Sequence, residues 1–181
     1  FYENFEGMSP GDDGSPVFAT SPAGDWSVVD VGGNKMYRVQ PADRSVATLV
    51  DIEVGDSFVA GYELLPVSGG TAGHTTMKFR ASDLTTGNLT AHGAGVRFSD
   101  VTAGLFAHTA GSYDGATSSS ALMTATAAPL KVVIEVDGSE GAVYVDDVLV
   151  GDSASLPTAP GGVGLFSYTG DVYFDQVTVM K

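Results

Sequence analysis

Short runs of β-branched and aromatic residues, separated by clusters of Gly, Asp, Asn and Pro, recur along the whole chain and constrain its fold more than any other feature. Helical spacing of apolar residues is nearly absent, and runs bounded by turn-forming residues are typical of β-strands. We expect strands near residues 1–6, 26–30, 35–40, 45–53, 56–66, 74–81, 92–98, 103–109, 120–126, 130–137, 141–150, 162–168 and 171–180. About a dozen strands with short loops predict an all-β fold, a sandwich of two antiparallel sheets.

The connections between the runs contain residues that favour turns. Asp137-Gly138 lies between two strongly alternating segments, which is a strong hairpin signal. Long loops rich in Gly, Ser, Pro and Asp are expected at 7–25 and 110–119. No internal repeat or linker divides the chain, so we expect a single β-sandwich domain over residues 1–181.

Length and composition suit a globular, secreted protein. With 181 residues, of which 43% are hydrophobic, the chain can bury a substantial core. No apolar run reaches the roughly 18 residues of a membrane helix. The first residue is Phe and no signal peptide is visible, which suggests a processed secreted protein or a domain of a longer chain. The absence of cysteine in a secreted domain favours a bacterial source.

Acidic residues greatly outnumber basic ones. The chain has 22 Asp and Glu against 8 Lys and Arg, a formal net charge of −14. Phosphate backbones and anionic membrane surfaces would be repelled, so neither nucleic acid nor a membrane is expected as a partner. The acids can serve as a solubilising surface in a salty medium, and some of them can ligate cations.

Both ends of the chain place a carboxylate beside apolar residues. In the last expected strand, Asp175 shares one face with Tyr173, Val177 and Val179 under strict alternation. A carboxylate on an apolar face is costly unless it is paired, and no basic residue is near Asp175 in the sequence. The ends therefore suggest that the first and last strands meet and share a metal ion, with calcium as the expected ion.

The order of several segments resembles the concanavalin A-like (laminin G-like) jelly-roll superfamily. It resembles, more narrowly, the non-catalytic modules of secreted bacterial polysaccharide-degrading enzymes. The resemblance implies polysaccharide binding and attachment to a catalytic domain in the full-length protein. The segments that carry it are Phe5–Gly7, Gly24–Asp30, Lys35–Arg38, Met77–Asp83, Leu130–Gly138, Val143–Asp146, Gly161–Leu165 and Val172–Val179.

Members of this superfamily often hold a structural calcium ion where the first and last strands meet. The resemblance implies Asp175 and Glu6 as carboxylate ligands here, with carbonyls from Gly7 or the Gly33–Asn34 turn. Calcium takes about 6–8 oxygen ligands of this kind. In the alternative, these acids are solvated, or Asp175 accepts backbone hydrogen bonds.

One segment matches a catalytic motif. Glu135, Asp137 and Glu140 have the Glu-x-Asp-x-x-Glu spacing of laminarinase-like glycoside hydrolases, whose retaining mechanism needs two carboxyl groups about 5–5.5 Å apart. Because Asp137-Gly138 predicts a turn, we expect Glu140 to lie beyond the turn and away from Glu135. Ordinary surface acids at a hairpin tip are therefore expected.

The three histidines are too far apart in sequence for a close metal-binding pair. His74 or His108 together with Tyr113 could act as the base and acid of a polysaccharide lyase. The alternative is that the histidines are isolated polar residues without a catalytic role.

Basic residues on neighbouring strands predict a ligand-binding face. Alternation points Lys78 and Arg80 away from the core side of Met77, and Arg97 is expected to face outward too. Guanidinium groups bind sugar hydroxyls and, bidentately, carboxylates, so an anionic polysaccharide is a reasonable ligand. In the alternative, these cations pair with acids on neighbouring strands.

Aromatic residues complete this prediction. Tyr113, in a Gly-rich loop, is expected to stack on a sugar ring, whereas Trp26 is expected to anchor the core. We therefore expect a non-catalytic, calcium-stapled polysaccharide-binding module that uses Lys78, Arg80, Arg97 and Tyr113. The alternatives are a small glycoside hydrolase or lyase, or a structural or adhesive cell-surface domain.

Overall fold

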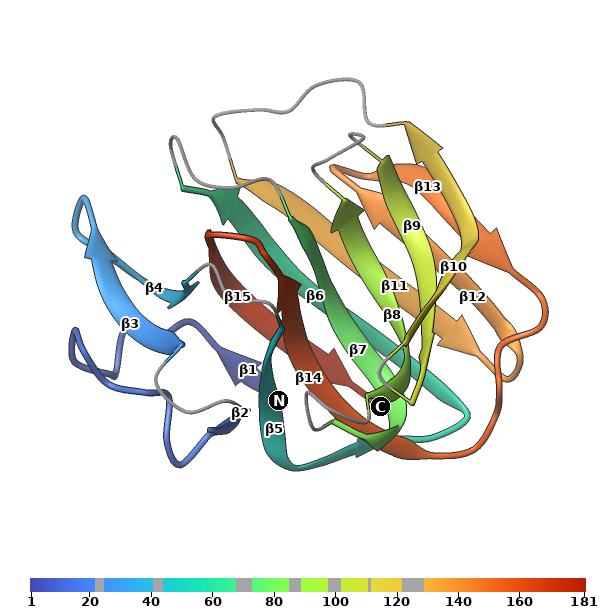
Figure 1. The fold of residues 1–181 in the computed structure, drawn as a ribbon, viewed down its shortest axis with the longest axis horizontal. Coiled ribbons are helices and arrows are strands. Elements are labelled where there is room, and N and C mark those ends of the chain that lie inside the picture. Colours follow the sequence, from blue (N-terminus) through green and yellow to red (C-terminus); the bar gives the residue numbers. More distant parts are fainter. Residues whose placement is uncertain are drawn as a thin grey trace.

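The protein forms two stacked β-sheets, as its alternating runs predict. The computed structural model describes residues 1–21, 25–40, 44–67, 73–84, 89–97, 102–110, 112–121 and 129–181. All strand pairs in both sheets are antiparallel, and the sheets lie face to face (Figure 1). The expected antiparallel β-sandwich is confirmed. Among the described residues, no helix is long and apolar enough to cross a membrane.

The eight-stranded sheet runs in the order β13-β12-β11-β6-β15-β4-β3, with β1 paired to β15. Its strands are β1 (Tyr2–Glu3), β3 (Trp26–Val31), β4 (Asn34–Val39), β6 (Ser57–Pro66), β11 (Leu130–Asp137), β12 (Glu140–Val145), β13 (Val148–Ser153) and β15 (Val172–Met180). The seven-stranded sheet runs in the order β10-β9-β8-β7-β14-β5-β2. Its strands are β2 (Phe18–Ser21), β5 (Ser45–Val54), β7 (His74–Asp83), β8 (Thr90–Arg97), β9 (Thr102–Thr109), β10 (Ser112–Ala121) and β14 (Gly161–Tyr168).

Three of the expected strands and loops were wrong, and the first is the long loop expected at 7–25, which contains strand β2. The expected strand 141–150 is the hairpin of β12 and β13, because Asp146 and Asp147 both have positive φ, 49° and 65°. Two successive left-handed residues form the tight turn that matches the twist of a hairpin. The loop expected at 110–119 is largely strand β10, so Tyr113 lies in a strand opposite His108.

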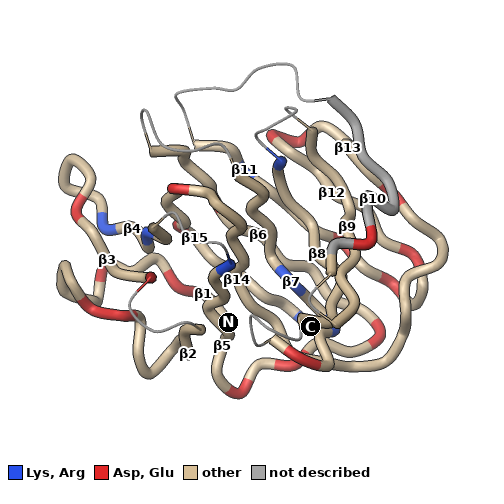
Figure 2. The backbone as a smooth tube through the Cα atoms, in the orientation of Figure 1, with Lys and Arg blue, Asp and Glu red and all other residues tan. Residues whose placement is uncertain are grey.

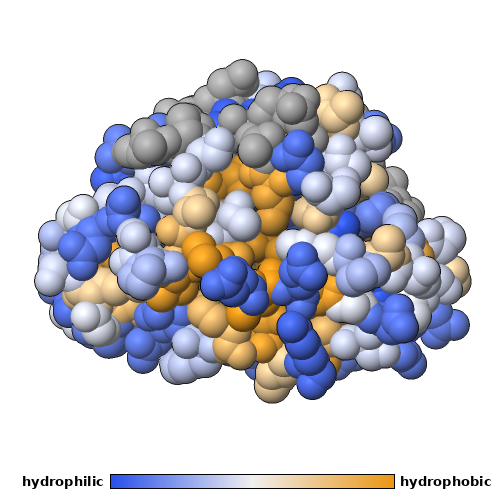
Figure 3. Space-filling model, turned by 90° about the horizontal axis from the view of Figure 1, so that it is seen from below, coloured by the Kyte–Doolittle hydropathy of each residue, from blue (hydrophilic) through white to orange (hydrophobic). Residues whose placement is uncertain are grey.

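The core lies between the sheets and is rich in aromatic rings. Trp26 is 1% exposed, and its ring centroid lies 5.1 Å from that of Tyr37 and 5.6 Å from that of Phe174. Each such pair adds about 0.5–1.5 kcal/mol beyond the buried area. The prediction that Trp26 anchors the core is confirmed. Seen from the end that is lowest in Figure 1, hydrophobic residues occupy the middle of the molecule between hydrophilic flanks (Figure 3).

The first and last strands meet, as expected. Tyr2 pairs with Thr178, and the amino group of Phe1 donates a hydrogen bond to the Val179 carbonyl at 2.9 Å. The face assigned to Asp175 was wrong, because β15 has a bulge at Gln176, whose φ is 50°. A bulge inserts one residue and reverses the alternation beyond it. Asp175 therefore does not share the core face of Val177.

Candidate functional site

Pairing between strands places a row of polar and aromatic residues across the seven-stranded sheet. His74 on β7 pairs with Tyr168 on β14 and with Arg97 on β8. Directly paired residues share a face of the sheet. Leu165 and Met77, which pair three positions further along these strands, pack in the core. By alternation, the row of Tyr168, His74 and Arg97 belongs to the outer face of this sheet.

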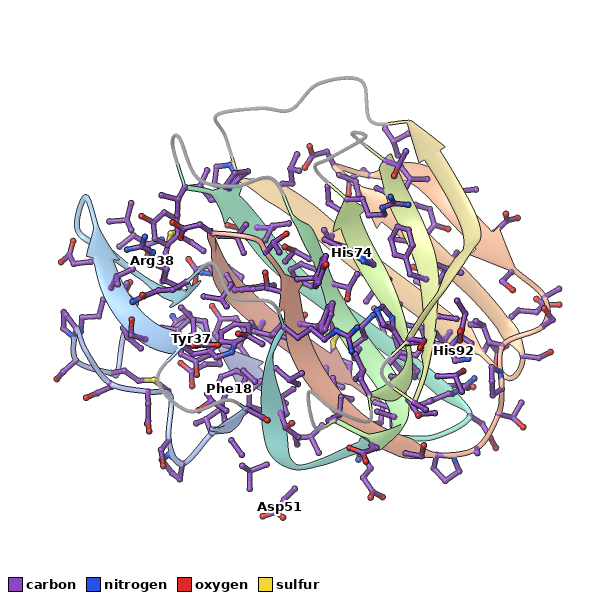
Figure 4. The ribbon with its side chains drawn as sticks, in the orientation of Figure 1. Phe18, Tyr37, Arg38, Asp51, His74 and His92 are labelled. Atoms are coloured by element: carbon purple, nitrogen blue, oxygen red, sulfur yellow. The ribbon has the colours of Figure 1, made fainter. Side chains whose placement is uncertain are left out.

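Aromatic rings gather beside this row. The His74 ring lies 4.5 Å from Phe106, 5.9 Å from His108 and 6.1 Å from Phe166, measured between centroids. His108 and Phe166 lie 5.2 Å apart. We call these four residues together with Lys78 the outer-face cluster. Figure 4 shows where His74 lies on β7.

Lys78 lies fully buried within this cluster. Its Nζ is 3.0 Å from His108 Nδ1 and 4.7 Å from the centroid of the Phe166 ring. A glycine at position 93 makes room for the chain, since a Cβ there would lie 2.7 Å from Lys78 Cδ. Burial disfavours the charged ammonium and lowers the pKa of Lys78 to about 7. Near neutral pH this side chain therefore exists in both charge states.

The two histidines of the outer-face cluster are neutral at pH 7. Burial lowers the pKa of His74 well below its usual range, and the positive charges of Lys78, His108 and Arg97 add to the effect. Burial also lowers the pKa of His108 to about 3, with smaller effects from Lys78 and Arg44. The charges that act on these two rings are thus all basic groups, in a chain whose net charge is −14.

A buried hydroxyl on the same face lacks an internal partner. Thr76 pairs with Phe166 across the ladder, and its side chain is fully buried. Its Oγ1 has no hydrogen-bond partner among the described residues. A buried polar group of this kind is costly unless something satisfies it, so the position suits a bound water or a ligand hydroxyl.

The structure brings two of the four predicted ligand-binding residues, Lys78 and Arg97, to the same face and separates Arg80 from them. Lys78 lies on the predicted side of β7, but the aromatic rings bury it. Arg97, at the end of β8, is half-buried and lies in the row with Tyr168 and His74. Tyr113 belongs to β10, but its side chain lies outside the described residues.

Arg80 does not join this face. Its backbone has a φ of 48° and lies in a bulge of β7. Its guanidinium donates hydrogen bonds to the carbonyls of Gly55, Asp56 and Pro157 at 3.0, 2.7 and 2.6 Å. Arg80 therefore connects the β5–β6 turn to the segment before β14.

Tyr168 is the residue that the sequence did not assign to the site. It is 43% exposed and is the direct partner of His74. Alternation from Leu165, read as a core residue, would have placed Phe166 and Tyr168 outward. The alternation of these residues is visible in the sequence, but the sequence does not show which side of β14 faces the core.

At the chain ends, the residues predicted to bind calcium make internal hydrogen bonds. Asp175, 1% exposed, accepts hydrogen bonds from Asn34 Nδ2 at 2.9 Å and from the backbone N–H of Gln176 at 2.8 Å. Gly33 has a φ of +93°, and its N–H donates to the carboxylate of Asp30. Asp175 thus accepts a backbone hydrogen bond, which was the alternative to the metal.

Lys35 supplies the positive charge at Glu6. The Glu6 carboxylate accepts the backbone N–H of Lys35 at 2.8 Å, and Lys35 Nζ donates to the carbonyls of Glu6 and Met8 at 2.9 and 2.7 Å. No group of three or more Asp, Glu or His among the described residues could hold a metal ion. The Lys35 ammonium thus contacts two carbonyl oxygens beside Glu6, and neither is one of the carbonyls expected to ligate calcium.

The expected separation of Glu135 from Glu140 was wrong. Asp137 pairs directly with Glu140 and Glu135 pairs with Ala142, so the three acids lie on one face of the β11–β12 hairpin. Glu140 lies on the next strand, as the turn predicts, but its pairing with Asp137 places it on the same face as Glu135.

Comparisons with known proteins support the fold. No protein-family model matches the sequence, and no curated protein matches it. Carbohydrate binding module CBM66 from Bacillus subtilis is similar, with a TM-score of 0.74, 17% identity, and coverage of 91% of this chain and 96% of that chain. A Bacillus subtilis protein of unknown function with a galectin-like fold has a TM-score of 0.70 at 11% identity, covering 99% of this chain and 98% of that chain.

A metal-bound structure is also among the similar folds. The exoplasmic/lumenal domain of VIP36 in its Ca²⁺/Man3GlcNAc-bound form has a TM-score of 0.64 at 7% identity, covering 91% of this chain and 84% of that chain. At these identities the similarity is one of fold.

Proposed function

We propose that this protein is a non-catalytic polysaccharide-binding module. The observation that carries the proposal is the row of Tyr168, His74 and Arg97 across an outer face, beside the outer-face cluster. Phe166 packs in a second hydrophobic cluster on this face, whereas Tyr168 is exposed and Arg97 is half-buried beside it, so these two side chains can contact a ligand. The fold similarity to CBM66 supports the same class of function.

Each residue of the row has a distinct part in binding. The exposed ring of Tyr168 offers an apolar surface on which a sugar ring stacks. The guanidinium of Arg97 donates hydrogen bonds to hydroxyls and, bidentately, to a uronate carboxylate. The charged side chains that act on His74 and His108 include Lys78, Arg97 and Arg44, in an otherwise acidic chain, which favours an anionic polysaccharide.

Affinity electrophoresis tests this proposal with a panel of neutral, uronate-containing and sulfated polysaccharides. We expect retardation by at least one glycan, and weakening of roughly tenfold in Tyr168→Ala and Arg97→Gln. Tyr2→Ala and Lys131→Gln are matched controls, because Tyr2 is 57% exposed on β1 and the Lys131 side chain is 58% exposed on the other sheet. Equal retardation of all four variants would refute the site.

The same panel separates the alternative functions. Release of shorter products from any glycan would establish a polysaccharide-degrading enzyme. A structural or adhesive cell-surface domain would show no retardation by any member of the panel. The proposed secreted, bacterial context is tested by the flanking sequence of the full-length protein, where we expect a polysaccharide-degrading catalytic domain.

The structural calcium ion stays part of the proposal as a prediction. Asp175 and Asn34 are oxygen-bearing neighbours at the chain ends, and calcium-bound VIP36 has a similar fold. Lys35 competes with calcium for the same corner. If calcium binds, a chelator lowers the melting temperature and added calcium restores it. An unchanged melt in both conditions would exclude the ion and leave Lys35 as the cation of this corner.

A further inference from the structure

A pocket of about 900 Å³ opens on the eight-stranded sheet, whereas the row of Tyr168 lies on the seven-stranded sheet. Pairing places Met180, Val59, Glu135, Ala142 and Asp152 side by side across five strands. The neighbouring residues along these strands pack in the core, so by alternation this row lies on the outer face. The volume is within the range of pockets that hold small ligands or peptide side chains, about 300–1,000 Å³.

Aliphatic side chains line part of this pocket. Leu149 is 52% exposed and Met180 is 58% exposed, although both are large hydrophobic residues. Val59 and Ala142 form a half-buried apolar surface between them. These apolar residues gather around the hollow and are not scattered singly over the surface.

Carboxylates line the other part. Glu135, Asp137, Glu140 and Asp152 are all exposed at the pocket, and the only basic side chain in its lining is Lys181. Asp137 and Glu140 lie directly opposite each other in the ladder. Like charges in this arrangement repel, so a cation placed between them would be stabilised. The backbone trace also shows acidic residues around β12 and β13 (Figure 2).

We propose that this pocket binds a Lys- or Arg-containing peptide segment that also carries an aliphatic side chain. Charge complementarity selects the cation, and the hollow around Leu149 and Met180 receives the aliphatic group. A bare metal ion does not suit the pocket, since aliphatic walls give no oxygen ligands and calcium needs about 6–8 of them. Phe58 is buried, and Tyr144 is the only other aromatic side chain in the lining. Sugar-binding surfaces use exposed aromatic rings, so a peptide suits the pocket better than a sugar.

The binding of two synthetic peptides to the whole chain tests this assignment. The probe is a fluorescently labelled, end-capped peptide of alternating Leu and Lys, and the comparison peptide replaces Lys with Glu. Fluorescence anisotropy should show salt-sensitive binding of the Leu-Lys peptide only. The double variant Glu135→Gln, Glu140→Gln should weaken it roughly three- to tenfold, as should Leu149→Ser.

Matched controls separate a pocket from general attraction to an acidic protein. Glu53→Gln removes an exposed acid and Val50→Ser removes a 42% exposed apolar residue, both on β5 of the other sheet. Neither control should change the affinity. Absence of binding, or equal weakening by Leu149→Ser and Val50→Ser, would overturn the proposal. So would tighter binding of a glucosamine oligomer that Leu149→Ser leaves unchanged, because it would identify an amino sugar as the occupant.

Discussion

Replacement of Lys78 by Met should change how stability depends on pH. Methionine keeps an unbranched side chain of similar length but removes the amine that burial leaves next to Phe166 and His108. In the unfolded chain the pKa of a lysine is near its usual value of about 10.4, whereas in the folded protein the pKa of Lys78 is about 7. Between these values the unfolded chain binds one more proton than the folded chain.

The sign and the size of the effect follow from this difference in bound protons. Wild-type stability should rise with pH between about 7 and 10.4, at about 1.4 kcal/mol per pH unit, because folding releases the proton. Over the whole window the gain is about 5 kcal/mol. Below about pH 7 both states are protonated, and the full cost of the buried ammonium of Lys78 is present. Lys78→Met has no such dependence.

Urea unfolding of both proteins at intervals from about pH 6 to 10.5 measures the effect, and the difference between their free energies cancels the titrating groups that do not interact with Lys78. The advantage of Lys78→Met should be greatest near pH 6 and should shrink by about 5 kcal/mol toward pH 10.5. Lys131→Met, at an exposed lysine, is the control and should give a flat difference. A flat difference for Lys78→Met as well would refute the burial argument.

Three other predictions concern the same sheet. Gly93→Ala should destabilise the protein by about 1–3 kcal/mol, because the new Cβ would contact Lys78. Gly7→Ala is the control and should not destabilise it, since no atom lies within 4 Å of a Cβ built at Gly7. Thermal unfolding compares the two variants. Arg80→Met should lower the free energy of unfolding by about 2–5 kcal/mol, because three hydrogen bonds to backbone carbonyls are lost. Under conditions where the variant stays folded, its retardation by glycans should not change. Weakened retardation would give Arg80 a direct role in binding. An anionic polysaccharide should bind more tightly at about pH 6 than at about pH 9, because Lys78, whose pKa is about 7, gains a proton; equal affinity would count against an anionic ligand.

Local turn chemistry and alternation were enough to predict the sandwich. The Asp137-Gly138 turn joins β11 to β12, and the first and last strands pair. The errors at the β12–β13 turn and in β15 fall where residues in the left-handed region, Asp146, Asp147 and Gln176, change the direction of the chain. Gln176 reverses the alternation of β15, and no residue type in that strand announces a bulge.

The site was less accessible to sequence reasoning, because burial depends on residues from distant strands. Alternation put Lys78 on the correct side of β7, but Phe166 and His108, which bury it, come from β14 and β9. The bulge at Arg80 turns its side chain toward Gly55 and Pro157. Charge and spacing identify candidate residues, whereas which of them meet is decided by the register between strands.

The pairing of Phe1 with Val179 has a mechanical consequence. Because β1 and β15 run antiparallel, the two chain ends lie next to each other, near the end of the same ladder (Figure 1). A force that pulls on both ends would load these hydrogen bonds one after another, as in unzipping, and not all together, as in shear. Under tension, β1 should peel away at low force before the interior of the sandwich bears any load.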